Sequence, residues 1–314
     1  MKVIAEIGVN HDGKLSKAKK LIKFSKLSGA DYVKFQLYKT ENLVITNSST
    51  ASYQKKISNN QYELLKKYEL SLKKFKILFR YCMQIKIQPL VTCFDLETFK
   101  EVNSIFKFNT YKIGSGDLDN FPLIYEIAKC NKKIILSTGM SSINEINLAL
   151  KTIYFSHKYK NHKPSIKIIN SIKLSASNLK YLSEKVIILH CISNYPAKVE
   201  DLNLNVISYL KEKYKLKVGF SDHSKSTVAP SVAMTLGAEY LEKHITISNF
   251  DLGPDHKASL NYKDFKLMVK NIDDTKKMYG DRKKKINFLE SQIAKVSRKS
   301  NYSKKKINKN EIFD

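Results

Sequence analysis

The stretches KVGFSDH at 217–223 and YLEKHIT at 240–246 carry the pattern from which the fold is predicted. Each has an apolar, β-prone body and ends in polar or ionisable residues. The pattern recurs in VIAEIG (3–8), YVKFQ (32–36), IQPLVTCF (87–94), TYKIGSG (110–116), KIILSTG (133–139) and VIILHCIS (186–193). Strands that are apolar along their length are typical of parallel sheets buried on both faces. Chemistry at their carboxyl ends is typical of a (β/α)8 barrel, whose active site lies on that rim.

Segments with a helical period of 3.6 residues separate these runs. They cover 16–29, 61–86, 95–106, 121–130, 142–155, 204–214, 227–238 and 262–280. The segment 61–86 is expected to form two helices that break near Leu70–Ser71, with Ser71 as the N-cap of the second. Strict alternation of strand and helix predicts an α/β fold, and eight units favour a closed TIM barrel over residues 1–282.

Two connections are longer than the rest. Residues 37–60 follow the second strand on the catalytic side, where loops of that length usually line a site. Residues 156–185 precede the sixth strand on the opposite face and are interpreted as a surface insertion. The last segment, 283–314, is polar and basic and is too short to fold alone.

The composition excludes several classes of protein. Of 314 residues, 42% are hydrophobic, and no apolar run reaches the roughly 18 residues of a membrane span. The first residues lack the apolar core of a signal peptide, which predicts a cytoplasmic protein. The four cysteines show no CxxC spacing and are expected to be reduced. The net charge is +27, but only three of the 56 basic residues are arginine, which argues against specific nucleic-acid binding.

Two histidines, His223 and His244, each fall at the end of one of the last two strands. Neutral imidazole is the commonest metal ligand in proteins and suits Mn, Fe or Zn better than Ca. Two protein ligands would leave positions open for water and substrate, as a catalytic metal requires. A role for one histidine as a general acid–base, or as a buried hydrogen-bonding residue, is an equal alternative on spacing alone. The other candidates are His256, His190 and His11.

Lys34, Lys112 and Lys243 lie near strand ends. Lysines there indicate either a clamp for an anion or a nucleophile that forms a Schiff base. In a lysine-rich chain most such residues are surface residues, but a lysine inside an apolar strand must be paired when buried.

Three serines, Ser115, Ser137 and Ser221, occupy comparable positions at the strand ends. Glycine-flanked turns let backbone N–H groups approach an anion, and hydroxyls add donors. Together with the lysines they predict a phosphate or carboxylate pocket. Glu6 ends the first strand, where a buried carboxylate indicates a base or a contact to metal-bound water; the alternative is a salt bridge to a neighbouring lysine.

The motifs that carry these residues resemble, in order, those of the sialic acid synthase (NeuB-type) family. They are AEIGVNHDG, VKFQ, KIGSGD, LSTGM, HCISNYP, GFSDHS, EKHIT and GPDHKAS. The resemblance implies a (β/α)8 barrel followed by a small antifreeze-like (SAF) domain. It also implies condensation of phosphoenolpyruvate with an N-acetylated hexosamine, typically N-acetylmannosamine, using Mn²⁺ or else Mg²⁺ or Co²⁺.

The resemblance also implies roles for individual residues. His223 and His244 would bind the metal, and Glu6 would contact a metal-bound water. The residues implied for phosphoenolpyruvate are Lys34, Lys112, Ser115, Ser137, Ser193 and Ser221. The residues implied for the sugar are Gln36, Asp117, Tyr195 and Asp255.

The chain departs from the family pattern in three places. Cys93 stands where the family usually has proline, and the 156–185 connection is longer than the family norm. Residues 283–314 resemble a linker and only the truncated beginning of the SAF domain. The resemblance implies a homodimer in which that domain supplies an arginine to the neighbouring sugar site, and this chain has no such arginine.

Three alternative functions remain open on the sequence. The first is a legionaminic or other nonulosonic acid synthase acting on a 6-deoxy di-N-acetyl sugar. The second is a Schiff-base aldolase that uses Lys112 or Lys34. The third is an inactive truncated homologue that binds ligands without turnover.

Overall fold

Eight parallel strands surround the centre of the molecule in the computed structural model, which describes residues 1–50, 58–159 and 162–312. The strands are β1 (Lys2–Gly8), β2 (Tyr32–Leu37), β3 (Gln88–Cys93), β4 (Thr110–Ile113), β5 (Lys133–Ser137), β6 (Val186–Cys191), β7 (Lys217–Asp222) and β8 (Tyr240–Thr246). Their order in the sheet is β3-β2-β1-β8-β7-β6-β5-β4. The end strands β3 and β4 contact each other, so the sheet nearly closes. The predicted (β/α)8 barrel is confirmed.

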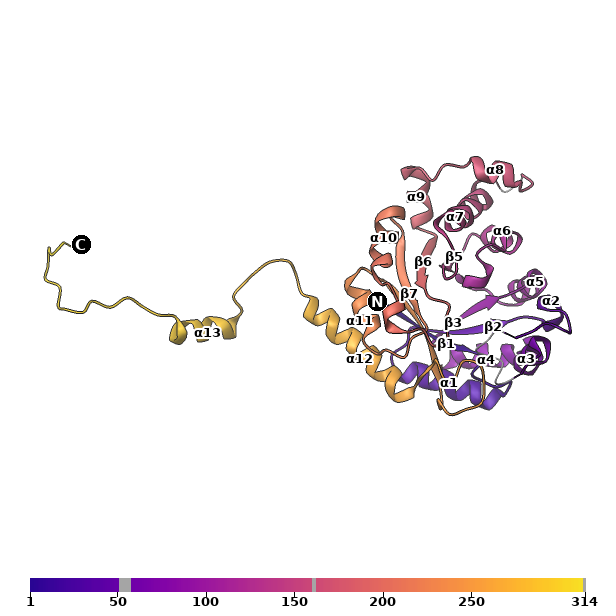
Figure 1. Cartoon of the computed structure of the whole chain (residues 1–314), viewed down its shortest axis with the longest axis horizontal. Coiled ribbons are helices and arrows are strands. Elements are labelled where there is room, and N and C mark those ends of the chain that lie inside the picture. Colours follow the sequence, from indigo (N-terminus) through magenta and orange to yellow (C-terminus); the bar gives the residue numbers. More distant parts are fainter. Residues whose placement is uncertain (51–57, 160–161, 313–314) are drawn as a thin grey trace. The chain divides into compact units, whose positions relative to one another are not determined.

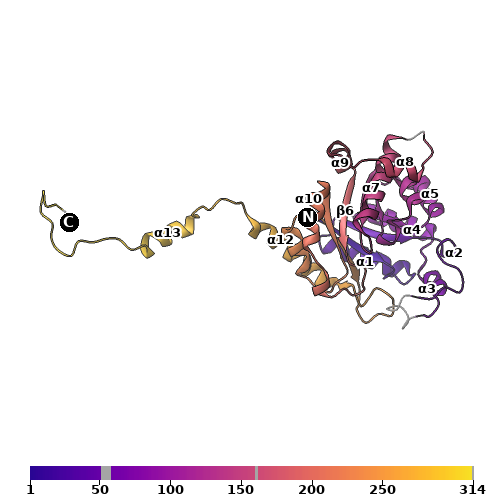
Figure 2. The same ribbon diagram turned by 45° about the horizontal axis from the view of Figure 1, so that its top comes forward.

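Helices cover the outside of this sheet (Figures 1 and 2). They are α1 (Leu15–Leu27), α2 (Thr40–Leu43), α3 (Gln61–Tyr68), α4 (Leu72–Gln84), α5 (Leu96–Ile105), α6 (Phe121–Lys129), α7 (Ile143–Lys158), α8 (Ile166–Ser171), α9 (Ala176–Ser183), α10 (Asn205–Tyr214), α11 (Ala229–Thr235) and α12 (Tyr262–Tyr279). Two 3-10 turns, η1 (Ser115–Asp117) and η2 (Val199–Asp201), and the short strand β9 (Leu260–Asn261) complete the barrel.

The two long connections contain structure of their own. The segment 156–185 holds the end of α7 and the helices α8 and α9, while residues 160 and 161 lie outside the described residues. The segment 37–60 holds α2, and its residues 51–57 also lie outside them. The predicted break between α3 and α4 is confirmed, since the Ser71 hydroxyl accepts a hydrogen bond from the Lys74 N–H at 3.4 Å.

The inside of the barrel changes from apolar to polar along its axis. An inner cluster of Ile4, Leu90, Ile135, Ile187 and Leu189 is buried apart from the main core. Backbone pairing sets Leu90 beside Lys34 and Ile135 beside Lys112. Paired residues of neighbouring strands share a face of the sheet, so both lysines point inward above an apolar floor.

The larger hydrophobic core lies between the outer face of the strands and the helices. Phe35 of β2 and Phe75 of α4, for example, are both fully buried and meet edge to face with ring centroids 5.4 Å apart. The barrel therefore has two separate apolar layers, as expected for strands buried on both faces.

The chain divides into two compact units, Met1–Lys277 and Met278–Asp314. The second contains α13 (Phe288–Ser297), which begins with a capping box between Asn287 and Glu290. None of its described residues, 278–312, is buried. The predicted boundary between residues 282 and 283, and the likeness of the second unit to the start of an SAF domain, stay predictions.

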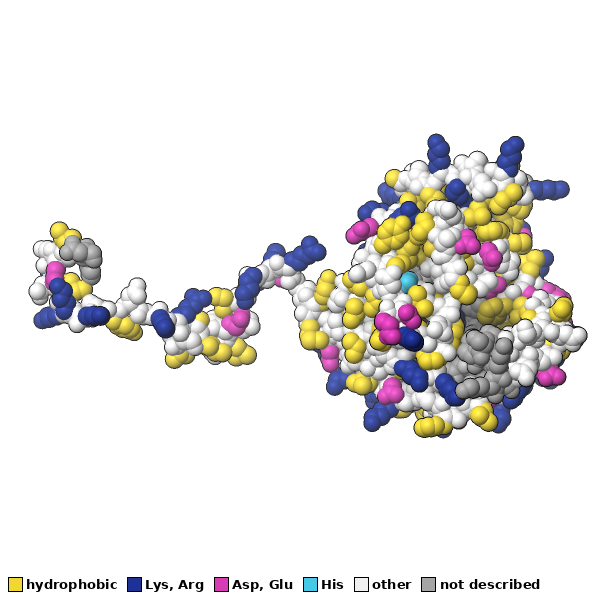
Figure 3. Space-filling view, viewed as in Figure 1, with side chains coloured by type: hydrophobic (Ala, Val, Ile, Leu, Met, Phe, Trp, Pro, Cys, Tyr) yellow, Lys and Arg dark blue, Asp and Glu magenta, His cyan; other side chains and the backbone are white. Residues whose placement is uncertain are grey.

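Two further expectations concern nucleic-acid binding and membrane insertion. Lys and Arg side chains on the face shown in Figure 3 are scattered among neutral and hydrophobic ones rather than gathered into one stripe. In the described part of the chain, no helix is both long and apolar enough to span a bilayer.

Candidate active site

A cavity of about 340 Å³ opens at the carboxyl ends of the strands. Eleven of its lining residues are predicted site residues, namely Glu6, Lys34, Gln36, Lys112, Ser115, Ser137, Ser193, Tyr195, Ser221, His223 and His244. The others are Thr92, Phe94, Gly114, Gly116, Met140, Cys191 and Glu242. Residues from across the sheet, far apart in sequence, therefore meet in one cavity, as the prediction required.

Glu242 lies between the two buried lysines. Its Oε1 is 3.2 Å from the Lys34 Nζ and 3.8 Å from the Lys112 Nζ. The Ser221 hydroxyl donates to the same oxygen at 3.1 Å. Two ammonium groups thus lie beside Glu242, and Lys34 also lies 3.5 Å from a Glu6 oxygen. Because the Glu6 carboxyl is only partly ionised at neutral pH, the two lysines leave positive charge available to a bound anion.

The two carboxyl groups of the cavity differ in acidity. Burial raises the pKa of Glu6 to about 7, although Lys34 opposes this shift. Burial would also raise the pKa of Glu242, but Lys112 and Lys34 together lower it to about 2. Glu242 is therefore ionised at neutral pH, while Glu6 can gain or lose a proton there.

Lys34 and Lys112 also differ. Burial lowers the pKa of Lys34, but Glu242 and Glu6 outweigh burial and raise it overall. Burial lowers the pKa of Lys112 to about 8. The Lys112 ammonium donates to the Ser137 hydroxyl at 2.7 Å and to the Ile113 carbonyl at 2.9 Å, which fixes its direction into the cavity.

The serine hydroxyls gather around Gly139, just after β5. The Gly139 N–H donates to the Ser115 hydroxyl at 3.0 Å. A Cβ at this position would lie 2.9 Å from the Ser115 hydroxyl and closer still to that of Ser193. Only glycine lets the two hydroxyls and this backbone converge, which is the predicted small-residue anion cradle.

The two imidazoles lie next to each other in the cavity lining, with ring centroids 5.6 Å apart and ring planes inclined by 59°. The Nδ1 of His223 lies 2.7 Å from the Ile192 carbonyl oxygen. In the neutral ring that contact places the proton on Nδ1 and leaves the lone pair of Nε2 for a ligand. Burial lowers the pKa of His223, but the Cys191 thiol outweighs burial and raises this pKa overall, so a metal ion would compete with a proton for Nε2. Burial, followed by His223 and Lys34, holds the pKa of His244 well below its usual value, so its ring stays neutral.

This donor set fits a divalent ion. The His244 Nδ1 is buried and has no hydrogen-bond partner among the described residues. A carboxylate oxygen of Asp255 lies 3.6 Å from it, beyond hydrogen-bond distance. An orphaned nitrogen on a neutral ring beside a second imidazole is the chemistry that binds Mn, Fe or Zn. The remaining coordination positions would belong to water or substrate.

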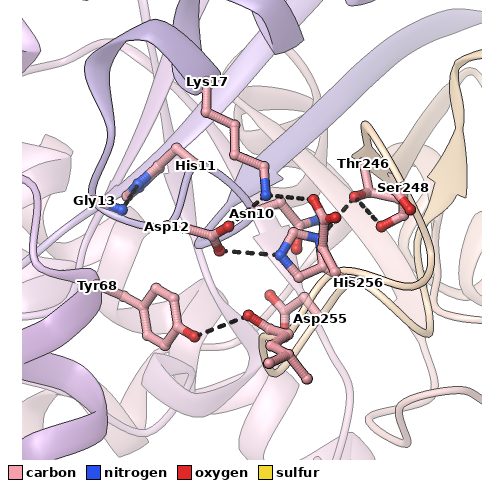
Figure 4. Close-up of polar contacts among 12 residues, drawn as sticks. Asn10, His11, Asp12, Gly13, Lys17, Tyr68, Thr246, Ser248, Asp255 and His256 are labelled. Carbon is pink, nitrogen blue, oxygen red and sulfur yellow. Dashed lines mark hydrogen bonds and ion pairs between the residues drawn. The ribbon is translucent and has the colours of Figure 1, made fainter.

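A second group of potential ligands lies outside the cavity. Within the described ranges, three ligand atoms come within 4.8 Å of one another only at Asp12, Asp251 and His256. Figure 4 shows that Lys17 already lies between the two carboxylates and pairs with both. His256 contacts Asp12 and Thr246. The group is therefore a structural link between the loops after β1 and β8.

The alternative metal ligands are engaged elsewhere. The His190 Nε2 lies 2.7 Å from the Leu202 carbonyl oxygen, at hydrogen-bond distance. The His11 Nδ1 accepts a hydrogen bond from the Gly13 N–H at 2.9 Å. Neither of these histidines, nor His256, lines the cavity.

Two predicted sugar residues lie outside the main cavity. Asp255 lines a smaller cavity of about 130 Å³ that also contains Gln36, Tyr195 and His244. Asp117 is buried in η1 and lines neither cavity. Burial raises the pKa of Asp117 to about 6, and its Oδ2 has no hydrogen-bond partner among the described residues.

The side chain of the third candidate lysine, Lys243, points away from the cavity. Its ammonium pairs with Asp222 at 2.6 Å, and both side chains are fully buried on the outer side of β7 and β8. Successive side chains of a strand alternate between faces, so Lys243 cannot share the cavity with His244. The same rule assigns Glu242 to the cavity face, two residues before His244. Sequence reasoning missed Glu242, although this spacing was available to find it.

Comparison with known proteins agrees with this geometry. The profile of the NeuB family matches residues 21–284. The chain belongs to the NeuB family. The N,N'-diacetyllegionaminic acid synthase of Campylobacter jejuni is 39% identical over 314 residues, which is 99% of this chain and 87% of the relative. The human N-acetylneuraminate-9-phosphate synthase is 30% identical, over 97% of this chain and 78% of its own length.

A solved structure of another NeuB-type protein is similar as a whole. The N-acetylneuraminic acid (sialic acid) synthetase of Leptospira borgpetersenii, solved in complex with citrate, gives a TM-score of 0.72 at 28% identity. The match covers 94% of this chain and 90% of that one. The resemblance inferred from eight short motifs is thus confirmed at the level of family and barrel.

Proposed function

We propose that this chain is a nonulosonic acid synthase, which joins phosphoenolpyruvate to an N-acetylated hexosamine and releases inorganic phosphate. The observation that carries the proposal is the pairing of an anion pocket with two converging imidazoles in one cavity. Membership of the NeuB family supports it, since the relatives at 39% and 30% identity are named N,N'-diacetyllegionaminic acid synthase and N-acetylneuraminate-9-phosphate synthase.

The lysines and hydroxyls account for the phosphoenolpyruvate side. Lys34 and Lys112, with Ser115, Ser137, Ser193 and Ser221, would hold the phosphate and carboxylate. Because Glu242 and a partly protonated Glu6 compensate only part of the lysine charge, a strongly anionic ligand is stabilised there. These groups sit on strand ends above an apolar floor, so they need little reorganisation during the reaction.

The histidine side would receive the sugar. His223 and His244 would hold a divalent ion such as Mn²⁺, or else Mg²⁺ or Co²⁺, which supplies Lewis-acid polarisation of the sugar aldehyde when bound. The C3 atom of phosphoenolpyruvate then bonds to the aldehyde carbon, and positive charge develops at C2 beside the bound phosphate. Water adds at C2, and the intermediate loses phosphate to give the 2-keto acid.

Glu6 is the residue best placed to carry a proton in this sequence. It accepts a hydrogen bond from the Gln36 amide at 2.8 Å and lies 3.5 Å from the Lys34 ammonium. A carboxyl group with a pKa near 7 can give a proton to the alkoxide or take one from the attacking water at neutral pH. Gln36, Tyr195 and Asp255 would contact the sugar.

The test is a phosphate-release assay with phosphoenolpyruvate, a panel of N-acetylated hexosamines and added Mn²⁺. Release should require both substrates, and metal stripping with EDTA or the change His223→Ala should abolish it. Lys112→Gln should lower kcat/KM by about 100-fold, as loss of one preorganised donor does. The matched control Lys266→Gln, at an exposed lysine of α12, should leave it unchanged.

Two outcomes would contradict the proposal. Full turnover after complete metal stripping would reject the role of the histidine pair. Trapping of a pyruvate adduct on Lys112 by borohydride would instead support the Schiff-base aldolase, because a lysine with a pKa near 8 is a competent nucleophile.

A further inference from the structure

The smaller cavity is a side chamber of the main one. It measures about 130 Å³ and shares Gln36, Tyr195 and His244 with the larger cavity. The larger cavity, at about 340 Å³, falls within the range of roughly 300–1,000 Å³ typical of small-molecule sites, and the smaller one does not. The side chamber is therefore sized for a substituent of a ligand whose reacting end lies at the histidines.

One wall of this chamber is apolar. It is formed by Val9 after β1, by Leu64, Leu65 and Tyr68 of α3, and by Pro254. Val9, Leu64 and Tyr68 form a buried hydrophobic cluster separate from the main core. Removing a ligand hydroxyl from water against such a wall costs free energy, whereas a methyl group gains it.

Two of the three tyrosines that line the chamber already use their hydroxyl proton in a hydrogen bond within the protein. The Tyr38 hydroxyl donates to the Leu65 carbonyl at 3.1 Å, and the Tyr68 hydroxyl to the Leu252 carbonyl at 3.5 Å. Figure 4 shows Tyr68 reaching toward the loop that carries Asp255. Both rings consequently add to the apolar wall and supply no donor to a sugar hydroxyl.

Gln36 and Asp255 bring hydrogen-bond acceptors to the chamber, which also contains the hydroxyl of Tyr195. The amide nitrogen of Gln36 donates to Glu6 at 2.8 Å, and the amide carbonyl oxygen is the acceptor that Gln36 can offer to a ligand. Asp255 supplies a carboxylate, held in place because Ser259 donates to its backbone carbonyl at 2.6 Å. Acceptors beside an apolar wall match a group that has both an N–H and a methyl, which is an acetamido group.

We propose that this chamber selects a six-carbon aldose with two acetamido groups and a terminal methyl over N-acetylmannosamine. The inference rests on the proposed function and names its sugar. N-acetylmannosamine would present hydroxyl groups at C4 and C6, whereas the 2,4-diacetamido-2,4,6-trideoxy sugar presents an acetamido group and a methyl. The relative at 39% identity is named for the nine-carbon product of such a sugar.

The experiment compares kcat/KM for the two sugars at saturating phosphoenolpyruvate and Mn²⁺. The wild-type chain should prefer the diacetamido sugar by at least about tenfold, the lower end of what one apolar group contributes to discrimination. Leu65→Asn, at a half-buried position on the wall, should reduce that preference by about tenfold while KM for phosphoenolpyruvate stays constant. Leu27→Asn, on the exposed side of α1, is the matched control and should keep the preference.

Val9→Thr is a second variant, because it replaces a methyl by a hydroxyl at almost constant volume. It should weaken the same preference even if Leu65→Asn folds poorly. Equal or better use of N-acetylmannosamine by the wild type would overturn the inference, as would variants that slow both sugars equally. Absence of phosphate release with every sugar would instead contradict the proposed function.

Discussion

Asp117 has an environment that sets it apart from the other predicted sugar residues. It is buried in η1, its Oδ1 accepts only a weak hydrogen bond from Asn120 at 3.4 Å, and its Oδ2 has no partner among the described residues. Burial raises its pKa to about 6, so the folded protein prefers the protonated form. An ionised Asp117 therefore destabilises the fold at neutral pH.

We expect Asp117→Asn to stabilise the chain at pH 8 and not at pH 4. In the unfolded chain Asp117 ionises above about pH 4, whereas in the folded protein it stays protonated up to about pH 6. The free energy of unfolding of the wild type therefore falls as the pH rises between these two values. The gain at pH 8 should reach at most about 3 kcal/mol, from a shift of roughly two pKa units. Urea unfolding at both pH values measures it.

A different result would show that Asp117 binds the substrate. If Asp117→Asn leaves stability unchanged at pH 8 but raises KM for the sugar, then Asp117 contacts the substrate as the family resemblance implies. Asn120→Ala, which removes the neighbouring donor, is the control for local disruption.

The types of residue in the site could be predicted from the sequence, but their electrostatic roles could not. Lys34 and Lys112 look alike in VKFQ and YKIG, yet one is ion-paired to two carboxylates and the other bonds to Ser137. Those differences depend on which strands are neighbours around the barrel. Glu242 comes close to both lysines only because β8 lies between β7 and β1 in the barrel. No local sequence pattern could therefore show that this carboxylate partly neutralises the two ammonium groups.

Among the elements, β8 has a different role on each of its two faces, because its successive side chains alternate between the cavity and the outer side. Glu242 and His244 face the cavity, while Lys243 between them faces outward and pairs with Asp222 of β7. The Lys243 ammonium also donates to the Ser224 carbonyl at 2.6 Å. This buried cluster ties the loop after β7, where His223 lies, to the neighbouring strand.

We expect Lys243→Met to lower the free energy of unfolding by about 3–5 kcal/mol, because it leaves Asp222 buried without its partner. The double variant Asp222→Asn with Lys243→Met should lose less than the single one, since no charge then remains unpaired. Urea unfolding of the three proteins checks this order. A single variant as stable as the wild type would show that Asp222 finds another partner or becomes protonated.

Helix boundaries at the elements nearest the site followed from local chemistry. The Ser71 cap between α3 and α4 is an example, because a hydroxyl that accepts from a backbone N–H is a short-range signal. The helices α8 and α9 were not separated from the 156–185 connection. They have only six and eight residues, too few for a helical period to stand out, and packing against α7 and β6 supports their helical state.

For the whole molecule, the eight repeated runs were sufficient to predict a barrel, but they did not indicate where its hydrogen bonding weakens. The sheet order begins at β3 and ends at β4, which touch without appearing as hydrogen-bonded neighbours among the described strands. Register is decided by packing around the full circle, so single-strand patterns do not contain it.

We expect removal of the residues after Gly280 to change the free energy of unfolding of the barrel by no more than about 0.5 kcal/mol. The described residues 278–312 bury no side chain, and exposed segments usually contribute little. Comparison of the full chain with a chain ending at Gly280 by urea unfolding tests this. A larger loss would mean that the second unit stabilises the barrel.

The side chamber gets its apolar wall from α3, a helix in the connection after β2, whereas the lysines and histidines stand on strands or directly at their ends. Exchange of a few side chains on that helix can therefore alter which carbohydrate is accepted while the reacting groups stay as they are.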